Sequence, residues 1–376
     1  MRLTPGQLNR ATLERQLLLR REPIGVVDGV RRIVAIQAQE PASPYVALWN
    51  RLEGFDPSEL DAAFATAAVV KASLMRITLH AVHADDHPTF HEAMTPTLRA
   101  ARLNDRRFRA TGLTIDEADA LVPALVERAG EVCTKDDIER LLGERLGGPP
   151  HEGVWWALRT YAPLVHAPTG GPWSFGRRPS YRAAPQGERP APDAALDGLV
   201  RRYLAGFGPA SARDVAQFAL RKMSDVRPAL ARMADTLTTA QGPDGDTLFD
   251  VPGAALPDED TPAPPRLLAM WDSILLAHAD RSRIIPEEHR AHVIRRNGDV
   301  LPTLLVDGRV AGVWRPIEGG IEARAFHPLD DATWDGLAAE AASLVALLAD
   351  REPDPYRRYA RWWEKLPDGE VTVLAG

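Results

Sequence analysis

Cysteine is almost absent from this sequence, which has Cys133 and no other among its 376 residues. A lone cysteine cannot form an internal disulfide, and it leaves no set of thiolates for a structural zinc site. Although ten histidines remain as possible ligands, we predict no bound metal and expect no cofactor.

Long hydrophobic runs are also missing. The first seven residues contain no apolar core of the kind found in a signal peptide, and no run approaches the roughly 18 apolar residues of a membrane span. Hydrophobic residues nevertheless make up 45% of the chain, enough for buried cores in roughly two to four domains. We therefore expect a globular protein of the cytoplasm with no membrane partner.

Lysine is scarce, because all but four of the 45 basic residues are arginine. Together with abundant alanine this bias points to a GC-rich genome, and it implies no function. The formal net charge of −7 argues against a protein that is basic over its whole surface. Any contact with nucleic acid would therefore need a local basic patch.

One order of elements recurs along the chain. Residues 111–190 predict helices that open with capping boxes at Thr114 and Thr134, a further helix at 151–161, and a hairpin with strands at 164–166 and 173–175. Residues 191–260 repeat this order, with Ser211 and Ser224 as helix N-caps and a hairpin at 236–249. This order is the outline of a winged helix, and residues 1–110 can be read as a larger version of it.

After residue 260 the sequence pattern changes from mainly helical to mainly strand-like. Alternating runs at 283–285, 292–294, 303–306, 310–314 and 321–326 predict short strands, and residues 330–350 predict a helix that crosses them. We therefore predict an α+β fold. Its domains would be three tandem winged-helix units at 1–110, 111–190 and 191–260, followed by a small β-rich domain at 261–376.

Two glutamines, Gln37 and Gln39, flank one small apolar residue. Apolar spacing in this region predicts a helix that opens at Asp28 and ends near Ala38, because Pro41 disfavours helical geometry in the residue before it. Residues two apart on a continuing helix face different sides, whereas beyond the helix end they can line one face. The alternative is that both amides are solvated surface.

Arginines gather in three places where each could neutralise a phosphate. An arginine-rich sequence also places such residues on ordinary solvated faces, paired with Asp and Glu, so the clustering is better support than any single residue. The clusters are Arg99, Arg102, Arg106, Arg107 and Arg109 at helical spacing, Arg177 and Arg178 after the second hairpin, and Arg281, Arg283, Arg290, Arg295 and Arg296 near the C-terminal strands.

Four segments together resemble the winged-helix DNA glycosylases of the AlkZ and YcaQ type, namely residues 32–39, 74–80, 271–283 and 301–315. The catalytic element of that family is Gln-apolar-Gln or Gln-apolar-Asp, and the form at Gln37-Ala38-Gln39 places the sequence nearer AlkZ. The resemblance implies excision of N7-alkylated purines, including the unhooking of interstrand crosslinks of the azinomycin B type. It also implies three tandem winged helices braced by a C-terminal β-barrel.

An amide pair suits that chemistry. A purine alkylated at N7 is cationic, so it can leave without protonation by a general acid. The remaining task is to place a water beside the anomeric carbon, and a Gln carbonyl can accept a hydrogen bond from that water. We predict that Gln37 and Gln39 hold the water and the sugar. Glu40 is a weaker candidate for the reaction, because it precedes Pro41 and is expected to be a surface residue. A crosslinked base cannot be fully extruded, which favours a shallow cleft.

The predicted partner is double-stranded DNA with alkylated purines, bound by a monomer that is associated with the nucleoid. In the first hairpin, alternation would put Arg76, Thr78 and His80 on one face, and the turns at 307–309 and 319–320 could each enter the minor groove. The alternatives are a transcription regulator and a noncatalytic binder of damaged DNA. The predicted DNA contacts are Arg76, Thr78, His80, Arg99, Arg102, Arg106, Arg177, Arg178, Arg281, Arg283 and Arg309.

Overall fold

The computed structural model of the protein describes residues 1–185, 187–367 and 369–375. Within the first 110 residues, Thr4 and Asp56 each cap a helix that begins with proline. The elements are α1 (Pro5–Arg15), α2 (Val26–Arg32), β1 (Ile36–Gln37), α3 (Ser43–Trp49), α4 (Pro57–Ala65), β2 (Val69–Ser73), the 3-10 turn η1 (Met75–Ile77), β3 (Leu79–His83), α5 (His87–Leu103) and α6 (Arg106–Arg109).

Residues 111–185 form helices followed by a hairpin, and the predicted capping boxes at Thr114 and Thr134 are both present. The strand expected at 173–175 is wrong. Ser174 has a φ of 59°, and the Trp173 ring packs 5.1 Å from that of Tyr45, so this segment folds back onto the first 110 residues. The elements are α7 (Ile115–Arg128), β4 (Cys133–Thr134), α8 (Lys135–Leu146), α9 (Glu152–Tyr161), β5 (Leu164–Ala167) and β6 (Ser180–Ala183).

The following segment repeats this order up to residue 250. Ser211 caps its second helix as predicted, but Ser224 caps nothing, because the third helix begins one residue earlier with Lys222 at the N-cap. The elements are α10 (Pro192–Phe207), β7 (Ala210–Ser211), α11 (Ala212–Ala219), α12 (Met223–Arg232), η2 (Ala234–Thr236), β8 (Thr238–Gln241) and β9 (Thr247–Asp250).

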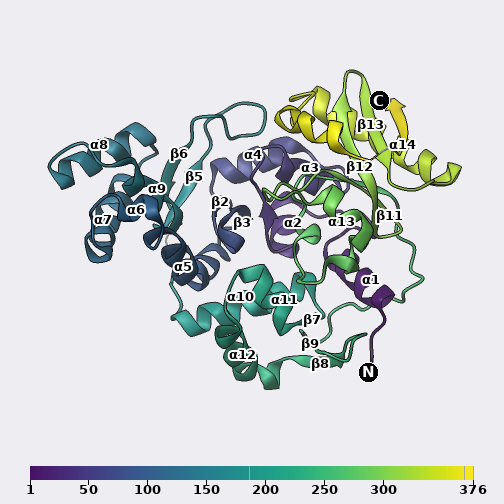
Figure 1. Cartoon of the computed structure of the whole chain (residues 1–376), viewed down its shortest axis with the longest axis horizontal. Coiled ribbons are helices and arrows are strands. Elements are labelled where there is room, and N and C mark those ends of the chain that lie inside the picture. Colours follow the sequence, from purple (N-terminus) through teal and green to yellow (C-terminus); the bar gives the residue numbers. More distant parts are fainter. Residues whose placement is uncertain (186, 368, 376) are drawn as a thin grey trace.

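The same strand order occurs three times along the chain. In each case a short strand pairs with the last strand of a hairpin, which gives the orders β1-β3-β2, β4-β6-β5 and β7-β9-β8. The first two sets join into one six-stranded sheet where Lys71 of β2 faces His166 of β5, and these strands run side by side in Figure 1. The predicted boundary at residue 110 therefore divides strands of a single sheet, and the division into domains stays a prediction.

The C-terminal part contains an open sheet of five antiparallel strands in the order β10-β11-β12-β13-β14. The expected barrel-like closure is therefore wrong, because β10 and β14 are edge strands that do not pair with each other. The elements are β10 (Arg266–Leu268), η3 (Ser273–Leu275), η4 (Arg281–Arg283), α13 (Glu287–Val293), β11 (Thr303–Val306), β12 (Arg309–Ile317), β13 (Gly320–Ala325), α14 (Asp331–Ala349), η5 (Arg357–Lys365) and β14 (Glu370–Ala375).

Two expected strands near the start of this part are also wrong. Residues 283–285 follow a 3-10 turn that the Asp280 side chain caps, and residues 292–294 lie at the end of helix α13. Helix α13 begins after Pro286 with two glutamates in its first turn, where negative charge favours helix formation. The helix expected at 330–350 is confirmed as α14, with Asp330 as its N-cap.

Helix α14 has the length and the composition to cross a membrane. One of its faces, which carries Leu337, Ala341 and Leu344, is buried, and the helix contacts strands β10, β13 and β14 of the open sheet. The helix thus covers one face of that sheet.

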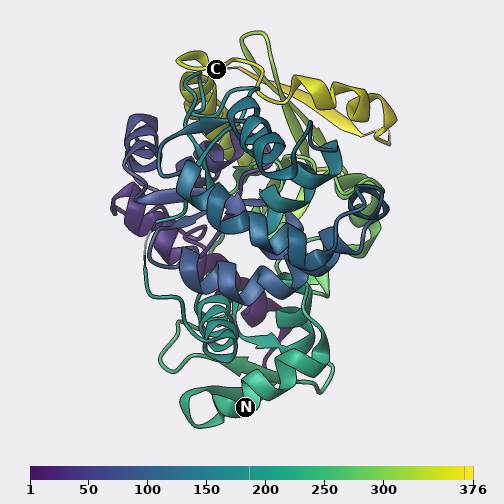
Figure 2. The ribbon, with the colours of Figure 1, turned by 90° about the vertical axis from the view of Figure 1, so that its left-hand side faces the viewer.

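The two termini lie at opposite ends of the molecule, as Figure 2 shows. Near the N-terminus, Arg2 forms a β-bridge with Gln241 of β8.

A buried ion pair joins the first 110 residues to the C-terminal part. The Arg51 guanidinium donates two hydrogen bonds of 2.8 Å to the Asp272 carboxylate, and both side chains are 1% exposed. Because a carboxylate that loses its only charged partner in such a place stays desolvated, removing one partner costs far more than removing both.

We expect Arg51→Met to lower the free energy of unfolding by about 3–5 kcal/mol, and the double variant Arg51→Met/Asp272→Leu to recover a large part of it. Urea denaturation at neutral pH measures both. Arg232→Ala, which breaks a solvent-exposed pair with Asp197, is the control and should cost less than about 1 kcal/mol. Equal losses for the single and double variants would contradict this account.

Candidate functional site around Gln37 and Gln39

Gln37 lies on strand β1 and not at the end of a helix. The helix predicted over residues 28–38 is shorter: it begins after Gly25, not at Asp28, and ends at Arg32. Val34 then has a φ of 75°, and the chain turns into β1, where Ile36 and Gln37 pair with residues of β3. The apolar spacing that predicted a longer helix is instead satisfied by burial on both sides of a short strand.

Gln37 is the last residue of β1 and Gln39 follows at a bend, so the expectation that the two amides converge stays a prediction. Between them, the backbone amide of Ala38 donates to the Leu79 carbonyl at 2.8 Å, which continues the pairing with β3. Gln37 is 3% exposed, whereas Gln39 is exposed. Only Gln39 therefore lies at the surface.

Both amide oxygens already accept hydrogen bonds from the protein. The Arg76 Nη2 donates to Gln37 Oε1 at 2.9 Å, and the Leu79 backbone amide donates to Gln39 Oε1 at 3.2 Å. A guanidinium and a backbone N–H can only donate, so the atom that each meets must be the amide oxygen. No described residue accepts a hydrogen bond from either amide nitrogen.

Arg76 lies in the turn η1 and not on a strand, so the predicted alternation of Arg76, Thr78 and His80 along one strand face is wrong. Arg76 and Ile77 have φ angles of 54° and 60°, the left-handed region that residues with side chains rarely occupy. The Thr78 hydroxyl donates back to the Met75 carbonyl at 3.1 Å, which closes the turn.

His80 is 1% exposed and lies beneath Arg76, so it does not contact DNA in this state, contrary to the prediction. Its Nδ1 donates to the Thr78 carbonyl at 3.1 Å, which leaves Nε2 to accept from Arg76 Nη2 at 3.3 Å. Burial, and then the charge of Arg76, lower the pKa of His80 to about 3. Burial likewise lowers the pKa of Arg76 to about 10, so at neutral pH the imidazole is neutral and the guanidinium is charged.

Glu40 is buried at 6% exposure, which contradicts the expectation of a surface residue. The Tyr359 hydroxyl of η5 donates to it at 3.0 Å. Its negative charge also acts on the buried Lys71, but desolvation outweighs that charge and lowers the pKa of Lys71 to about 8. The segment after Gln39 is therefore held by the C-terminal part.

Two further predicted contacts lie in η4, which follows the open sheet's first strand. Arg281 is half-buried, forms no ion pair with a described residue, and is close enough that its charge adds to the lowering of the pKa of Arg76. Arg283 is engaged within the protein, where it donates to the Pro209 carbonyl at 3.1 Å and the Thr12 hydroxyl at 3.3 Å.

The other predicted DNA contacts fall into two groups: arginines that bind other residues of the protein, and arginines that are exposed. Arg99 forms an ion pair with Asp119, and Arg102 donates to the Thr160 hydroxyl at 3.0 Å and lies over the Trp156 ring. The remaining contacts are exposed, with Arg177 and Arg178 inside the loop between β5 and β6 and not after the hairpin. The exposed group is Arg106, Arg177, Arg178 and Arg309.

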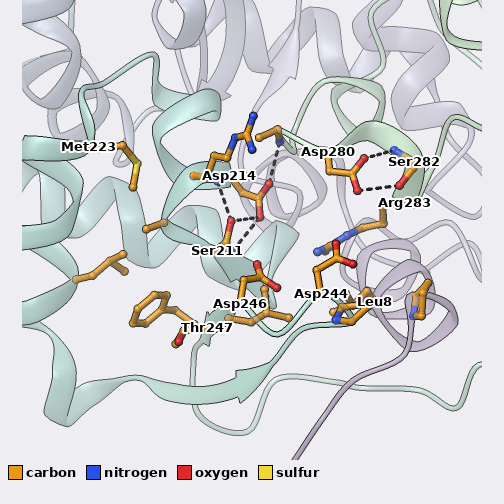
Figure 3. A pocket seen from close by; sticks show the side chains of 18 of the residues that line it. Leu8, Ser211, Asp214, Met223, Asp244, Asp246, Thr247, Asp280, Ser282 and Arg283 are labelled. Atoms are coloured by element: carbon orange, nitrogen blue, oxygen red, sulfur yellow. Dashed lines mark hydrogen bonds between the residues drawn. The ribbon is translucent and has the colours of Figure 1, made fainter. Parts of the chain in front are cut away.

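A large cavity of about 1170 Å³ lies elsewhere, between α11, α12, the β8–β9 hairpin and the residues around η4 (Figure 3). Within it Asp214 accepts from the Ser211 hydroxyl at 2.7 Å and the Ala279 amide at 2.8 Å. Neither Gln37 nor Gln39 lines it. Sequence reasoning missed this cavity, because its walls come from segments that are far apart in the chain.

Comparisons with known proteins agree with one another. A family model described as DNA glycosylase AlkZ-like matches residues 30–347. An interstrand DNA cross-link repair glycosylase from Streptomyces sahachiroi is 26% identical over 354 residues, which covers 89% of this chain and 93% of the relative. The solved structure of the Streptomyces sahachiroi DNA glycosylase AlkZ matches with a TM-score of 0.77 at 23% identity, over 92% of this chain and 96% of that chain. The structural match shows the same mixed α+β fold.

We expect the free energy of unfolding to fall as the pH drops from 7 to 5, because several buried histidines stay neutral in the folded protein. Their folded pKa lies below the unfolded value of about 6.5, so in this window the unfolded state binds more protons and gains stability. Urea denaturation at several pH values measures the slope, and His80→Asn should make it shallower. A flat profile between pH 7 and 5 would contradict this. The histidines concerned are His80, His87, His91, His166 and His278.

Proposed function

The chain belongs to the AlkZ-like DNA glycosylase family, and from that premise we propose that it hydrolyses the N-glycosidic bond of cationic N7-alkylated purines in duplex DNA. The relative from Streptomyces sahachiroi is named for interstrand cross-link repair, so we include unhooking of such crosslinks in the proposal. The observation that carries it is the placement of Gln37 and Gln39, two neutral amides at the end of strand β1 and at the bend just after it.

Neutral amides are sufficient for this substrate because the lesion is already activated. The positive charge on an N7-alkylated purine weakens the glycosidic bond, and the base leaves as a neutral molecule without a general acid. The task left to the protein is to hold water and sugar in a reactive geometry, which Gln37 and Gln39 perform in this proposal. The nearby carboxylate of Glu40 is buried against Tyr359, so it is placed to support the segment and not to act as a base.

The recurring strand order supports three tandem winged-helix units, each with a short strand and a two-stranded wing. Winged helices commonly bind duplex nucleic acid, which fits a monomer that grips double-stranded DNA through several units in one chain. We propose the cytoplasm as its compartment, where the chromosome of a bacterium lies. The exposed Arg106, Arg177, Arg178 and Arg309 are the best placed residues to meet phosphates, since described carboxylates form no ion pair with them.

Incubation with duplex DNA that contains N7-methylguanine, followed by alkali, should cut the strand at the lesion because excision leaves an abasic site. Gln37→Ala/Gln39→Ala should lower the single-turnover rate on the order of 100-fold. Gln241→Ala, on the exposed edge of β8, is the control and should keep the wild-type rate. Binding without scission by the wild type would favour a regulator or a noncatalytic binder.

Phosphate contacts predict a steep loss of duplex affinity with salt. Each phosphate that an arginine neutralises adds about 0.9 to the slope of log affinity against log salt. We expect Arg177→Ala/Arg178→Ala to weaken binding to undamaged duplex and to reduce that slope by about 1–2, measured by fluorescence anisotropy. An unchanged slope would remove the β5–β6 loop from the DNA-binding surface.

A further inference from the structure

Arg76 has no negative partner among the described residues. Its guanidinium contacts three neutral groups, which are the Gln37 carbonyl at 2.9 Å, the His80 imidazole at 3.3 Å and the Phe218 ring, whose centre lies 5.5 Å away. Its Nη1 is buried and has no hydrogen-bond partner in the described part of the chain. A cation placed this way lowers the stability of the fold, because burial without a counter-ion carries a desolvation penalty. Its presence therefore suggests a role other than stability.

The backbone around Arg76 is also held in an unfavourable conformation. Arg76 and Ile77 are consecutive residues with side chains in the left-handed region, and such outliers persist only where the surroundings impose them. Here Leu74 and Thr78 impose them, since the Leu74 amide donates to the Thr78 carbonyl and the Ile77 amide donates to the Leu74 carbonyl, each at 3.0 Å. The fold therefore keeps the Arg76 side chain on Gln37 at a cost in stability.

The contact also fixes the orientation of the amide. Arg76 can only donate, so the Gln37 atom that it meets is the oxygen, and the amide nitrogen points away from Arg76. The Leu79 amide imposes the same orientation on Gln39. Two independent donors, one from η1 and one from the start of β3, thus turn both amide nitrogens away from the protein atoms that hold the oxygens.

We propose that Arg76 is a positioning residue that fixes the Gln37 amide, so that Gln37 and Gln39 meet the damaged nucleotide with N–H donors and not with carbonyl acceptors. This inference rests on the proposed glycosylase function and deepens it. The prediction from chemistry alone was that a Gln carbonyl accepts from water. Here one lone pair of each carbonyl oxygen is already occupied by a protein donor, whereas neither amide nitrogen has an acceptor among the described residues. It also gives Arg76 a role other than the phosphate contact that the sequence suggested.

The amide N–H donors of Gln37 and Gln39 are sufficient to hold the attacking water at this substrate. An amide N–H can donate to one lone pair of the water oxygen while the second lone pair faces the anomeric carbon. The new C–O bond then forms as the glycosidic C–N bond breaks, its electron pair neutralises the cationic purine, and the proton of the attacking water passes to solvent. No base is needed at the moment of attack, because the departing purine supplies the driving force.

Three substitutions test the role of Arg76. Arg76→Met removes the donor while keeping the length, and Arg76→Lys keeps a donor that cannot accept. Arg182→Met is the matched control, because Arg182 is another half-buried guanidinium that donates to the carbonyls of Phe64 and Ala65 without an ion pair. Each variant is assayed with N7-methylguanine duplex for single-turnover excision, for duplex affinity and for the salt dependence of that affinity.

We expect Arg76→Met to lower the excision rate about tenfold or more, with affinity unchanged within about twofold and the salt slope unchanged. Arg76→Lys should recover most of the rate, and Arg182→Met should keep it. A folded Arg76→Met protein with the wild-type rate would overturn the inference. Loss of affinity with a shallower salt slope would overturn it too, since Arg76 would then be a phosphate contact.

Gln37→Glu is a second test that does not depend on how well Arg76→Met folds. The introduced carboxylate meets Arg76 as an ion pair and offers no donor on its outward side. We expect it to lose as much rate as Gln37→Ala, whereas a carbonyl that accepts from water would predict that Gln37→Glu retains or exceeds the wild-type rate. Wild-type protein that yields no alkali-sensitive sites would reject the glycosylase proposal itself, and the variants are interpreted only where wild type excises.

Discussion

The pairing of strand β1 with β3 is the constraint on which the site depends. It places Gln37 opposite His80 and continues through the hydrogen bond from Ala38 to Leu79. Gln37 therefore lies on a strand and not on a helix, and Gln39 follows two residues later at a bend. The same pairing brings Leu79 and the turn before it within reach of both carbonyl oxygens.

The rest of the molecule holds this short strand in place from several directions. The Ser273 hydroxyl donates to the carbonyl just before β1 at 2.7 Å, and Tyr359 fixes Glu40 just after Gln39. Phe218 of α11 packs against Arg76. Segments from the third repeat and the C-terminal part therefore converge on the residues around the Gln-Ala-Gln triplet, so a site read from residues 32–39 needs distant parts of the chain to form.

Charge is local in this protein. The chain carries a formal charge of −7, yet the surroundings of the Gln37 amide are cationic, with Arg76 in contact and Arg281 close enough to affect it. A positive site suits the approach of a phosphate backbone, while the groups that touch the glutamines are neutral or donor-only. In the proposed function, exposed arginines would contact phosphates while Arg76 would orient Gln37.

Much of the local structure could be read from the sequence, because it depends on contacts within one turn. The capping boxes at Thr114 and Thr134 and the N-cap at Ser211 need only a side chain and an amide three residues apart. The hairpin of β8 and β9 was accessible from its turn, whereas Gln37 and Gln39 were singled out by their spacing and by the family resemblance.

The tertiary structure alone decided the rest. It made residues 36–37 a strand, left the C-terminal sheet open and buried His80. It also placed the amide oxygens of Gln37 and Gln39 against protein donors. Each of these results depends on partners far away in the chain, such as the 39 residues that separate Arg76 from Gln37. Periodicity and capping motifs involve only residues close together in the sequence, so they do not predict such pairs. The sequence could thus supply two amides, and only the fold could decide that their oxygens are the atoms held by protein donors.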